Sequence, residues 1–183
     1  MRFPLKAQLA DSLGEFGRTR SLVLAGLLTA AAVVMDRLLT IEVSAVLEIG
    51  FAFLATALCG RLCGPWVAGT AGVAVDILSY FLRPNGGFFF GFTLNQFLLG
   101  FIYGLWLYKR RPSVWRAVGA CLTVTVLINF LLTPLWLHMM YGQAFVIFST
   151  AKIVKNVVKL PLDAALLYGM LHLAERADRR LAA

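Results

Sequence analysis

The sequence predicts an all-α membrane protein with six transmembrane helices and with both termini in the cytoplasm. Hydrophobic residues make up 60% of the 183 residues and charged residues only 14%, which leaves too little polar surface for a soluble domain of this length. A helix that spans a bilayer needs about 20 residues, with a range of about 17–25. Six apolar segments can be marked off: Leu22–Leu39, Val46–Leu62, Trp66–Phe81, Phe89–Tyr108, Ala117–Tyr141 and Phe145–Leu173.

The distribution of basic residues predicts on which side of the membrane each end of the chain lies. Cytoplasmic segments between spans are enriched in Lys and Arg. With the N-terminus inside, the inner segments hold twelve of the 17 basic residues, and the outer loops hold only Arg37 and Arg83. The twelve are Arg2, Lys6, Arg18, Arg20, Arg61, Lys109, Arg110, Arg111, Arg116, Arg176, Arg179 and Arg180. The net charge of +8 is therefore explained by topology, and nucleic acid is not expected as a partner.

Composition separates three parts of the chain. Residues 1–20 mix charged and apolar side chains, which is typical either of an amphipathic helix on the inner membrane surface or of a disordered leader. Residues 21–173 show no internal repeat and form one membrane domain, and residues 174–183 form a basic cytoplasmic tail. The three cysteines lack the His or acidic neighbours of a metal cluster, so we expect them to pack in the core and to bind no metal.

The stretch between the third and fourth apolar segments differs from the lipid-facing sequence around it. Pro84 and the glycines that follow predict a tight turn, and a run of phenylalanines comes directly after it. Thr93 and Asn95 then enter the fourth segment with donors and acceptors that lipid cannot satisfy. The pattern favours two interpretations equally: a pocket for a flat, polar ligand, or an aromatic belt at the membrane interface.

Other polar residues inside the apolar segments also need partners. Placing Asp76 within a span costs about 2.5–3.5 kcal/mol on insertion scales, so we expect it to contact another helix rather than a ligand. Pro134 lacks a backbone donor and should bend the fifth segment. Trp136 and His138, which follow it, either anchor the helix at the outer interface or line a pocket.

Small residues four positions apart predict faces where helices approach closely. Gly26 and Ala30 form one such pair in the first segment, and Gly100 and Gly104 form another in the fourth. Such faces usually serve packing within one protein, and less often the docking of a partner subunit.

Polar residues share one face of the sixth segment. Lys152, Lys155, Asn156 and Lys159 are spaced by three and four residues, which places them on a single stripe of a helix. Several ammonium groups within a membrane are costly unless an anion or a water-filled cavity receives them. We therefore favour a carboxylate- or phosphate-bearing ligand over a merely peripheral helix.

The order of these features resembles the substrate-binding S components of energy-coupling factor (ECF) vitamin importers, most closely the folate branch. The resemblance covers roughly residues 21–173. It is carried by Ile49–Leu54, Cys63-Gly64-Pro65, Asp76-Ile77-Leu78, Pro84–Leu94, Gly100–Leu105, Leu135-Trp136-Leu137, Tyr141-Gly142 and Lys152–Pro161.

The resemblance implies a six-helix S component in a prokaryotic plasma membrane, with a vitamin pocket open to the outside. Such a subunit docks on a membrane coupling subunit that is driven by two cytosolic ATPases. Gly26 and Ala30 match the docking motif of the family. The sequence has no Walker-type phosphate loop, in keeping with ATP hydrolysis by the partner subunits.

For the site, we expect folate to bind with no cofactor and no catalytic residue. The flat pterin would lie among aromatic side chains, and polar side chains would bond its edge. The glutamate carboxylates would meet basic residues. The expected residues are Phe89, Phe92 and Trp136 for the ring, Thr93, Asn95 and Asn156 for its edge, and Arg37, Lys152 or Lys159 for the carboxylates.

Three alternatives remain open at this stage. The first is an S component for another small anionic or heterocyclic nutrient. The second is a small intramembrane enzyme that uses His138 or Asp76, which is disfavoured because His138 and His172 are predicted on opposite sides of the membrane. The third is a membrane partner protein without a ligand, which leaves the lysines of the sixth segment unexplained.

Overall fold

A computed structural model describes residues 5–38, 41–42, 48–82, 88–141 and 145–181, and almost all of them are helical. One antiparallel pair of two-residue strands interrupts the helices. The elements are α1 (Leu5–Gly14), η1 (Glu15–Gly17), α2 (Thr19–Leu38), β1 (Ile41–Glu42), β2 (Glu48–Ile49), α3 (Ala52–Cys63), α4 (Pro65–Leu82), α5 (Phe90–Leu107), α6 (Val114–Val124), η2 (Thr125–Leu132), α7 (Thr133–Tyr141) and α8 (Phe145–Leu181).

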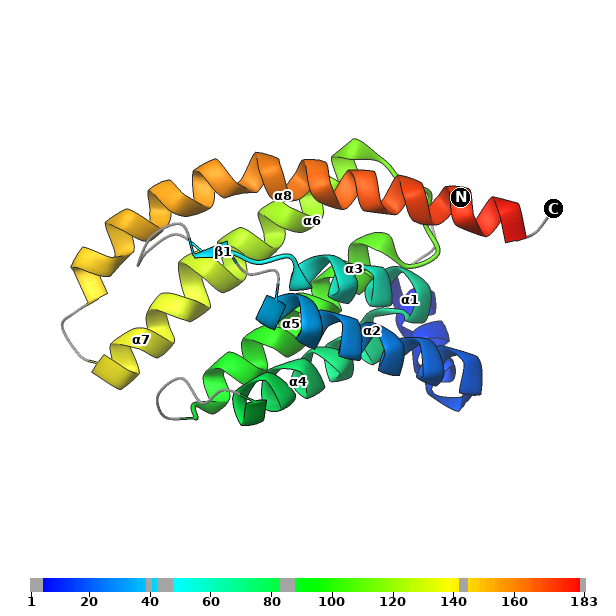
Figure 1. The fold of residues 1–183 in the computed structure, drawn as a ribbon, viewed down its shortest axis with the longest axis horizontal. Coiled ribbons are helices and arrows are strands. Elements are labelled where there is room, and N and C mark those ends of the chain that lie inside the picture. The colour runs from blue at the N-terminus through cyan, green and yellow to red at the C-terminus, as the bar shows by residue number, and fades with distance from the viewer. Residues whose placement is uncertain (1–4, 39–40, 43–47, 83–87, 142–144, 182–183) are drawn as a thin grey trace.

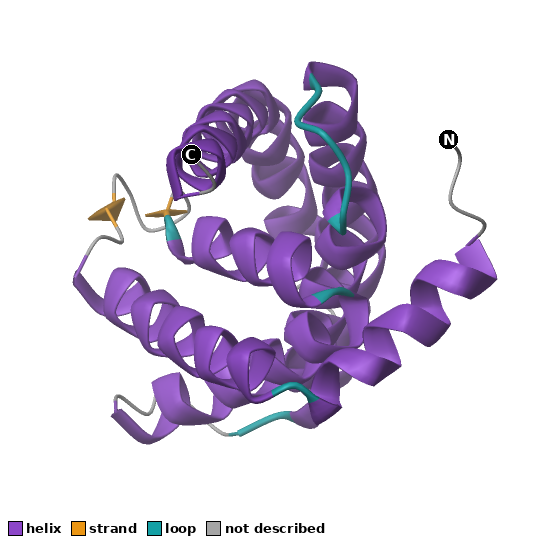
Figure 2. Ribbon diagram, turned by 90° about the vertical axis from the view of Figure 1, so that its right-hand side faces the viewer, coloured by secondary structure: helices purple, strands orange, loops and turns teal. Residues whose placement is uncertain are grey.

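The long helices run up and down in a bundle, with both chain ends at the same end of the molecule (Figure 1). We call this the terminal end, and the end that holds β1, β2 and α7 the distal end. The helix α2 packs against α3 and α4, and α8 packs against α6 and α3. Viewed from the terminal end, the short helix α1 lies across the bundle rather than along it (Figure 2).

Among the described elements, α4 and α5 make the most extensive contact, and glycines allow the two helices to approach closely. A Cβ atom at Gly100 would collide with the backbone carbonyl of Ala68, and one at Gly104 would collide with Pro65. On α4, a Cβ at Gly72 would collide with the carbonyl of Gln96. The predicted close-packing role of Gly100 and Gly104 is therefore confirmed.

The turn into α4 follows its sequence signals. Gly64 has a φ of +88°, a conformation that favours glycine, and Pro65 then begins the helix. Ser12 of α1 lies against this turn and accepts a hydrogen bond from the backbone N–H of Trp66 at 3.3 Å. An orphan donor in the first turn of α4 is thus satisfied from α1.

The predicted bend near Pro134 takes the form of a change in helix type. The helices α6, η2 and α7 form one continuous path, and η2 is a π-helix directly before Pro134. Proline cannot donate to the carbonyl four residues earlier, and a wider helical turn accommodates the missing bond. This places α7 and Trp136 at the distal end (Figure 1).

Four helical stretches of the described residues are long and apolar enough to cross a membrane: Thr19–Asp36, Pro65–Leu82, Phe90–Leu107 and Val114–Met140. The helix α3 is a shorter apolar helix. The all-helical membrane prediction is confirmed apart from the small strand pair. The predicted second segment began too early, because Glu48 and Ile49 pair in a strand before α3 begins at Ala52. The count of six spans and the side of the termini stay predictions.

Adding a single methyl group at the α4–α5 contact should destabilise the protein. We expect Gly100→Ala to lower the thermal unfolding midpoint in detergent, since overpacking costs about 1–3 kcal/mol. Gly169→Ala is the matched control, because a Cβ there meets nothing within 4 Å and alanine favours a helix. Equal midpoints for the two variants would show that the close approach carries no stability.

Candidate functional site

Three of the predicted aromatic residues meet at the distal end. The ring centroid of Phe89 lies 5.8 Å from that of Trp136 and 6.0 Å from that of Phe92. The backbone of Phe89 is extended just before α5 begins, which turns its ring towards α7. Phe88 and Phe90 are instead exposed. The phenylalanine run therefore divides between an inward aromatic group and the outward rings that an aromatic belt would use.

Asn95 links α5 to α7 through both ends of its side-chain amide. The indole Nε1 of Trp136 donates to Asn95 Oδ1 at 3.0 Å, and Asn95 Nδ2 donates to Thr133 Oγ1 at 3.2 Å. Asn95 is buried, so leaving these groups unpaired would cost about 1–3 kcal/mol each. The structure thus brings together Phe89, Phe92 and Trp136, which were predicted to hold the ligand ring, and Asn95, which was predicted to bond its edge.

The buried hydroxyl of Thr93 bonds a carboxylate on the neighbouring helix. Thr93 Oγ1 donates to Asp76 Oδ2 at 2.7 Å. Asp76 therefore has the interhelical partner that its position within a span requires, as predicted. A similar bond, which the sequence did not indicate, joins Ser79 Oγ to Asp36 Oδ2 at 3.1 Å.

The polar stripe of α8 is described only in part. Asn156 is buried, and the Lys159 ammonium lies 3.9 Å from Asp163 Oδ2 one turn further on. Sequence reasoning placed Lys159 on a stripe of cations and did not pair it with Asp163, although their spacing of four is visible in the sequence. The side chains of Arg37, Lys152 and Lys155, and the turn at residues 83–87, lie outside the described part of the structure.

The residues predicted for partner docking lie on an open face of α2. A Cβ at Gly26 would meet nothing within 4 Å, and Ala30 is exposed. Val23 and Leu27 next to them are exposed as well. Ala25, one residue before Gly26, is buried against α3 and α4 instead. The helix α2 therefore packs with one face and leaves the face of Gly26 and Ala30 uncovered by the described chain.

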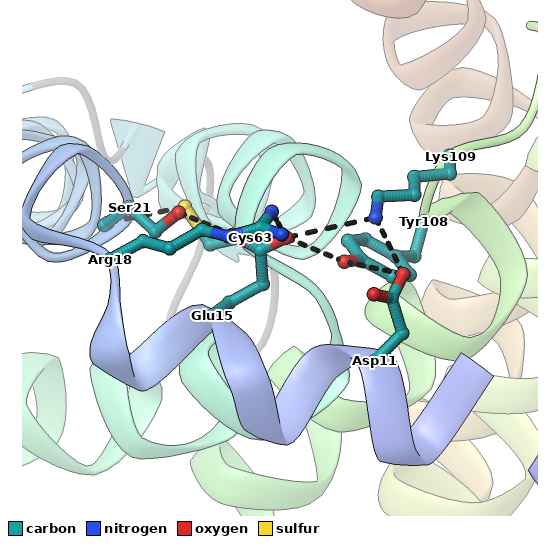
Figure 3. Close-up of polar contacts among 7 residues, drawn as sticks. All are labelled: Asp11, Glu15, Arg18, Ser21, Cys63, Tyr108 and Lys109. Carbon is teal, nitrogen blue, oxygen red and sulfur yellow. Dashed lines mark hydrogen bonds and ion pairs between the residues drawn. The ribbon is translucent and has the colours of Figure 1, made fainter. Parts of the chain in front are cut away.

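A second polar cluster closes the terminal end, and sequence reasoning missed it (Figure 3). Glu15 is buried at its centre and accepts hydrogen bonds from Ser21 at 2.5 Å and from Tyr108 at 2.9 Å. Arg18 contributes an ion pair to the same carboxylate at 2.7 Å, and Lys109 pairs with Asp11 at 2.5 Å. The cluster ties α1 to the start of α2 and to the end of α5.

These contacts shift the pKa values of the cluster. Burial alone would raise the pKa of Glu15, but hydrogen bonds from Ser21 and Tyr108 and the charges of Arg18 and Lys109 outweigh it, so that pKa is held below 4.5. The hydrogen bond from Lys109 lowers the pKa of Asp11 below 3.8 and raises the pKa of Lys109. Burial raises the pKa of Tyr108 to about 12.

The cluster should hold α1 in place over a defined pH range. Carboxylates with lowered pKa values stabilise the fold above their ordinary pKa and lose this effect as the pH falls through the lowered values. Tyr108 and Lys109, whose pKa values are raised, stabilise it below their ordinary values and lose this effect at high pH. The mobility of a nitroxide on Gly14→Cys should therefore be lowest between about pH 5 and 10, and it should rise as the pH falls below 4.5 through the lowered pKa values of Glu15 and Asp11.

The spin-label experiment has a matched control in Glu15→Gln, which removes one titrating group of the cluster. This variant should show a smaller rise in mobility below pH 4.5 than the protein with Glu15 intact. The native thiols do not interfere, because Cys59, Cys63 and Cys121 are all buried. An acid transition of unchanged size in Glu15→Gln would contradict the role given to Glu15.

The arrangement at the distal end places aromatic rings beside amide and hydroxyl groups, and comparisons with known proteins point to the class of protein that carries it. The model of the family "ECF transporter, substrate-specific component" matches residues 20–171. The protein named folate transporter FolT from Clostridium novyi (strain NT) is 33% identical over 146 residues, which cover 80% of this chain and 84% of that protein.

Two further comparisons point the same way. The folate transporter FolT from Leuconostoc mesenteroides subsp. mesenteroides is 31% identical over 160 residues, which cover 84% of this chain and 85% of that protein. A crystal structure of FolT bound with folic acid aligns with a TM-score of 0.77 at 38% identity, and the alignment covers 84% of this chain and 93% of that one.

These matches confirm the resemblance found in the sequence. They identify a transport subunit rather than an enzyme and a multi-pass protein of the bacterial membrane. Since the family model spans most of the chain and both relatives exceed 30% identity over about four fifths of it, the chain belongs to the substrate-specific components of ECF transporters.

Proposed function

We propose that this subunit binds folate from outside the cell for an ATP-driven ECF importer. Both curated relatives are named folate transporters, and the similar crystal structure contains folic acid. The observation that carries the proposal is the group of Phe89, Phe92, Asn95 and Trp136 at the distal end. Rings whose positions are fixed in advance lose little conformational entropy when a flat ligand stacks on them.

Asn95 has a double role in this proposal. Its bonds to Trp136 and Thr133 hold the indole in one orientation, and its second N–H remains to bond the edge of the pterin. Thr93 already donates its proton to Asp76, so it contributes as an acceptor or by fixing that carboxylate. Asn156, which is buried on α8, supplies a further amide for the ring edge.

The two carboxylates of folate need basic partners. Arg37, Lys152 and Lys159 are the cations that the sequence places near the outer membrane surface. Because Lys159 is paired with Asp163, a ligand carboxylate there competes with a carboxylate of the protein. We therefore assign the main charge contacts to Arg37 and Lys152, and a weaker one to Lys159.

The proposal includes the full membrane arrangement. Six spans are formed by α2, α3, α4, α5, the path from α6 to α7, and α8, with the terminal end in the cytoplasm. The positive residues of the terminal end support this orientation. In ECF systems the S component pairs with a membrane coupling subunit and two ATPases, and the open face of Gly26 and Ala30 is suited to a close helix contact.

Folate binding can be measured by calorimetry on the detergent-purified subunit. We expect saturable binding that weakens at least tenfold in Asn95→Ala, because the variant leaves Trp136 Nε1 unpaired and frees the indole to rotate; a tenfold change is about 1.4 kcal/mol. Trp136→Ala should weaken binding at least as much through lost stacking. Gly169→Ala, on an open face of α8, should bind like the unchanged protein.

The same titration with other small anionic or heterocyclic nutrients tests the alternative within the family. Binding of another vitamin, with none of folate, would refute the folate assignment and keep the transport class. If no nutrient of the panel bound, the distal aromatic group would not be a ligand site, and a partner protein without ligand would be the better account.

Docking can be separated from binding by a substitution on α2. Gly26→Leu fills the open face, so we expect it to abolish folate uptake by cells that express the coupling module while folate affinity stays unchanged. Gly169→Leu, which also projects into open space, is the matched control and should leave uptake intact. Normal uptake with Gly26→Leu would place the docking surface elsewhere.

A further inference from the structure

The helix α1 lies outside residues 20–171, which match the family model, and it is amphipathic in an unusual way. Its buried face is polar: Gln8, Ser12 and Glu15 are only 2%, 0% and 3% exposed. Gln8 Nε2 donates to the carbonyls of Gly104 and Leu105 at 3.2 and 3.0 Å, near the end of α5. The polar face of α1 thus satisfies backbone groups at helix ends and is not available to water or lipid.

The apolar face of α1 points away from these contacts. Leu9, Leu13 and Phe16 each directly follow one of the three buried polar residues, and successive helical residues are rotated by about 100°. Leu13 is 55% exposed and Phe16 38% exposed. Because its polar face lies on the end of the bundle, α1 presents its apolar face about 100° away from those contacts.

The position of α1 in the chain places this face close to the first candidate membrane span. Only η1 and one residue separate α1 from α2, whose apolar stretch begins at Thr19. Lys6, Arg18 and Arg20 lie close to the apolar residues in the chain and are exposed, and Arg18 also pairs with Glu15. An exposed apolar face with basic neighbours next to a candidate span is complementary to anionic phospholipid, in which acyl chains and negative headgroups meet.

We propose that α1 binds anionic phospholipid of the inner leaflet through Leu9, Leu13 and Phe16, while its polar face fastens the ends of α4 and α5. The helix would then connect the lipid surface to the bundle and fix the height of the terminal end in the membrane. The proposal requires the membrane setting of the bundle but not the identity of the transported ligand.

The test uses the full-length protein in nanodiscs and adjacent spin labels. Leu13→Cys and Gly14→Cys each receive a nitroxide, and the buried native cysteines stay unlabelled. Power saturation then compares collisions with oxygen, which concentrates in lipid, and with a water-soluble nickel chelate. Gly14 is the matched control, because it is one residue away and open to solvent on a different side of the helix.

In nanodiscs of phosphatidylcholine with phosphatidylglycerol, we expect the label at position 13 to favour oxygen and the label at 14 to favour nickel. Phosphatidylcholine alone should reduce the difference. Equal nickel access at both positions would overturn the proposal. The proposal would also be overturned if the label at position 13 collided with nickel in nanodiscs and lost this access only after the coupling subunit was added. That result would assign this face to a protein partner.

Discussion

The close contact between α4 and α5 is the constraint on which the rest of the structure depends. Glycine positions leave room for the backbone of the other helix, and no side chain can be added at Gly72 or Gly100 without a collision. This fixes the register of the two helices, so Thr93 of α5 lies opposite Asp76 of α4. The same register carries Asn95 to the point where α7 arrives, and there it orients Trp136. The arrangement of Asn95 and Trp136 is thus a consequence of backbone packing, and the proposed ligand site owes its rigidity to glycines that lie nearer the middle of the helices.

The two ends of the bundle use polar residues differently. At the distal end, amide, hydroxyl and indole groups bond one another beside aromatic rings, the setting in which the proposed ligand would stack. At the terminal end, Glu15 accepts from three different residues and every group of the cluster has a charged or hydroxyl partner. Such a saturated network stabilises one arrangement and offers little to a ligand. A transport subunit must bind and release its ligand while its helix bundle stays folded. The distal end is suited to the first requirement and the saturated polar cluster of the terminal end to the second.

Much of this could be predicted from the sequence, because lipid imposes strong rules on helix length, composition and small-residue contacts. The helical membrane fold, the glycine contacts at 100 and 104, and the interhelical partner of Asp76 all follow from such rules.

The terminal cluster could not be found in this way. It joins residues about ninety positions apart, such as Tyr108 and Glu15, and no sequence periodicity indicates such a pair. The predicted second segment began too early because Glu48 and Ile49 form a strand that pairs with Glu42 and Ile41. Apolar composition does not distinguish a strand from a helix over so few residues. Lys159 shows a third limit. Sequence reasoning grouped the basic residues of one helix face and did not consider that Asp163, one turn further on, pairs with Lys159.

The central claim, that the distal aromatic group receives the ligand, can be tested by the positions of the four tryptophans. Trp66, Trp106 and Trp115 lie near the terminal end, at the start of α4, the end of α5 and the start of α6, and only Trp136 lies at the distal end. Protein labelled with 5-fluorotryptophan gives one ¹⁹F resonance for each, which single Trp→Phe variants assign. Addition of folate should shift the Trp136 resonance strongly and leave the other three nearly unchanged. A saturating folate signal at a terminal tryptophan, with Trp136 unmoved, would contradict the account.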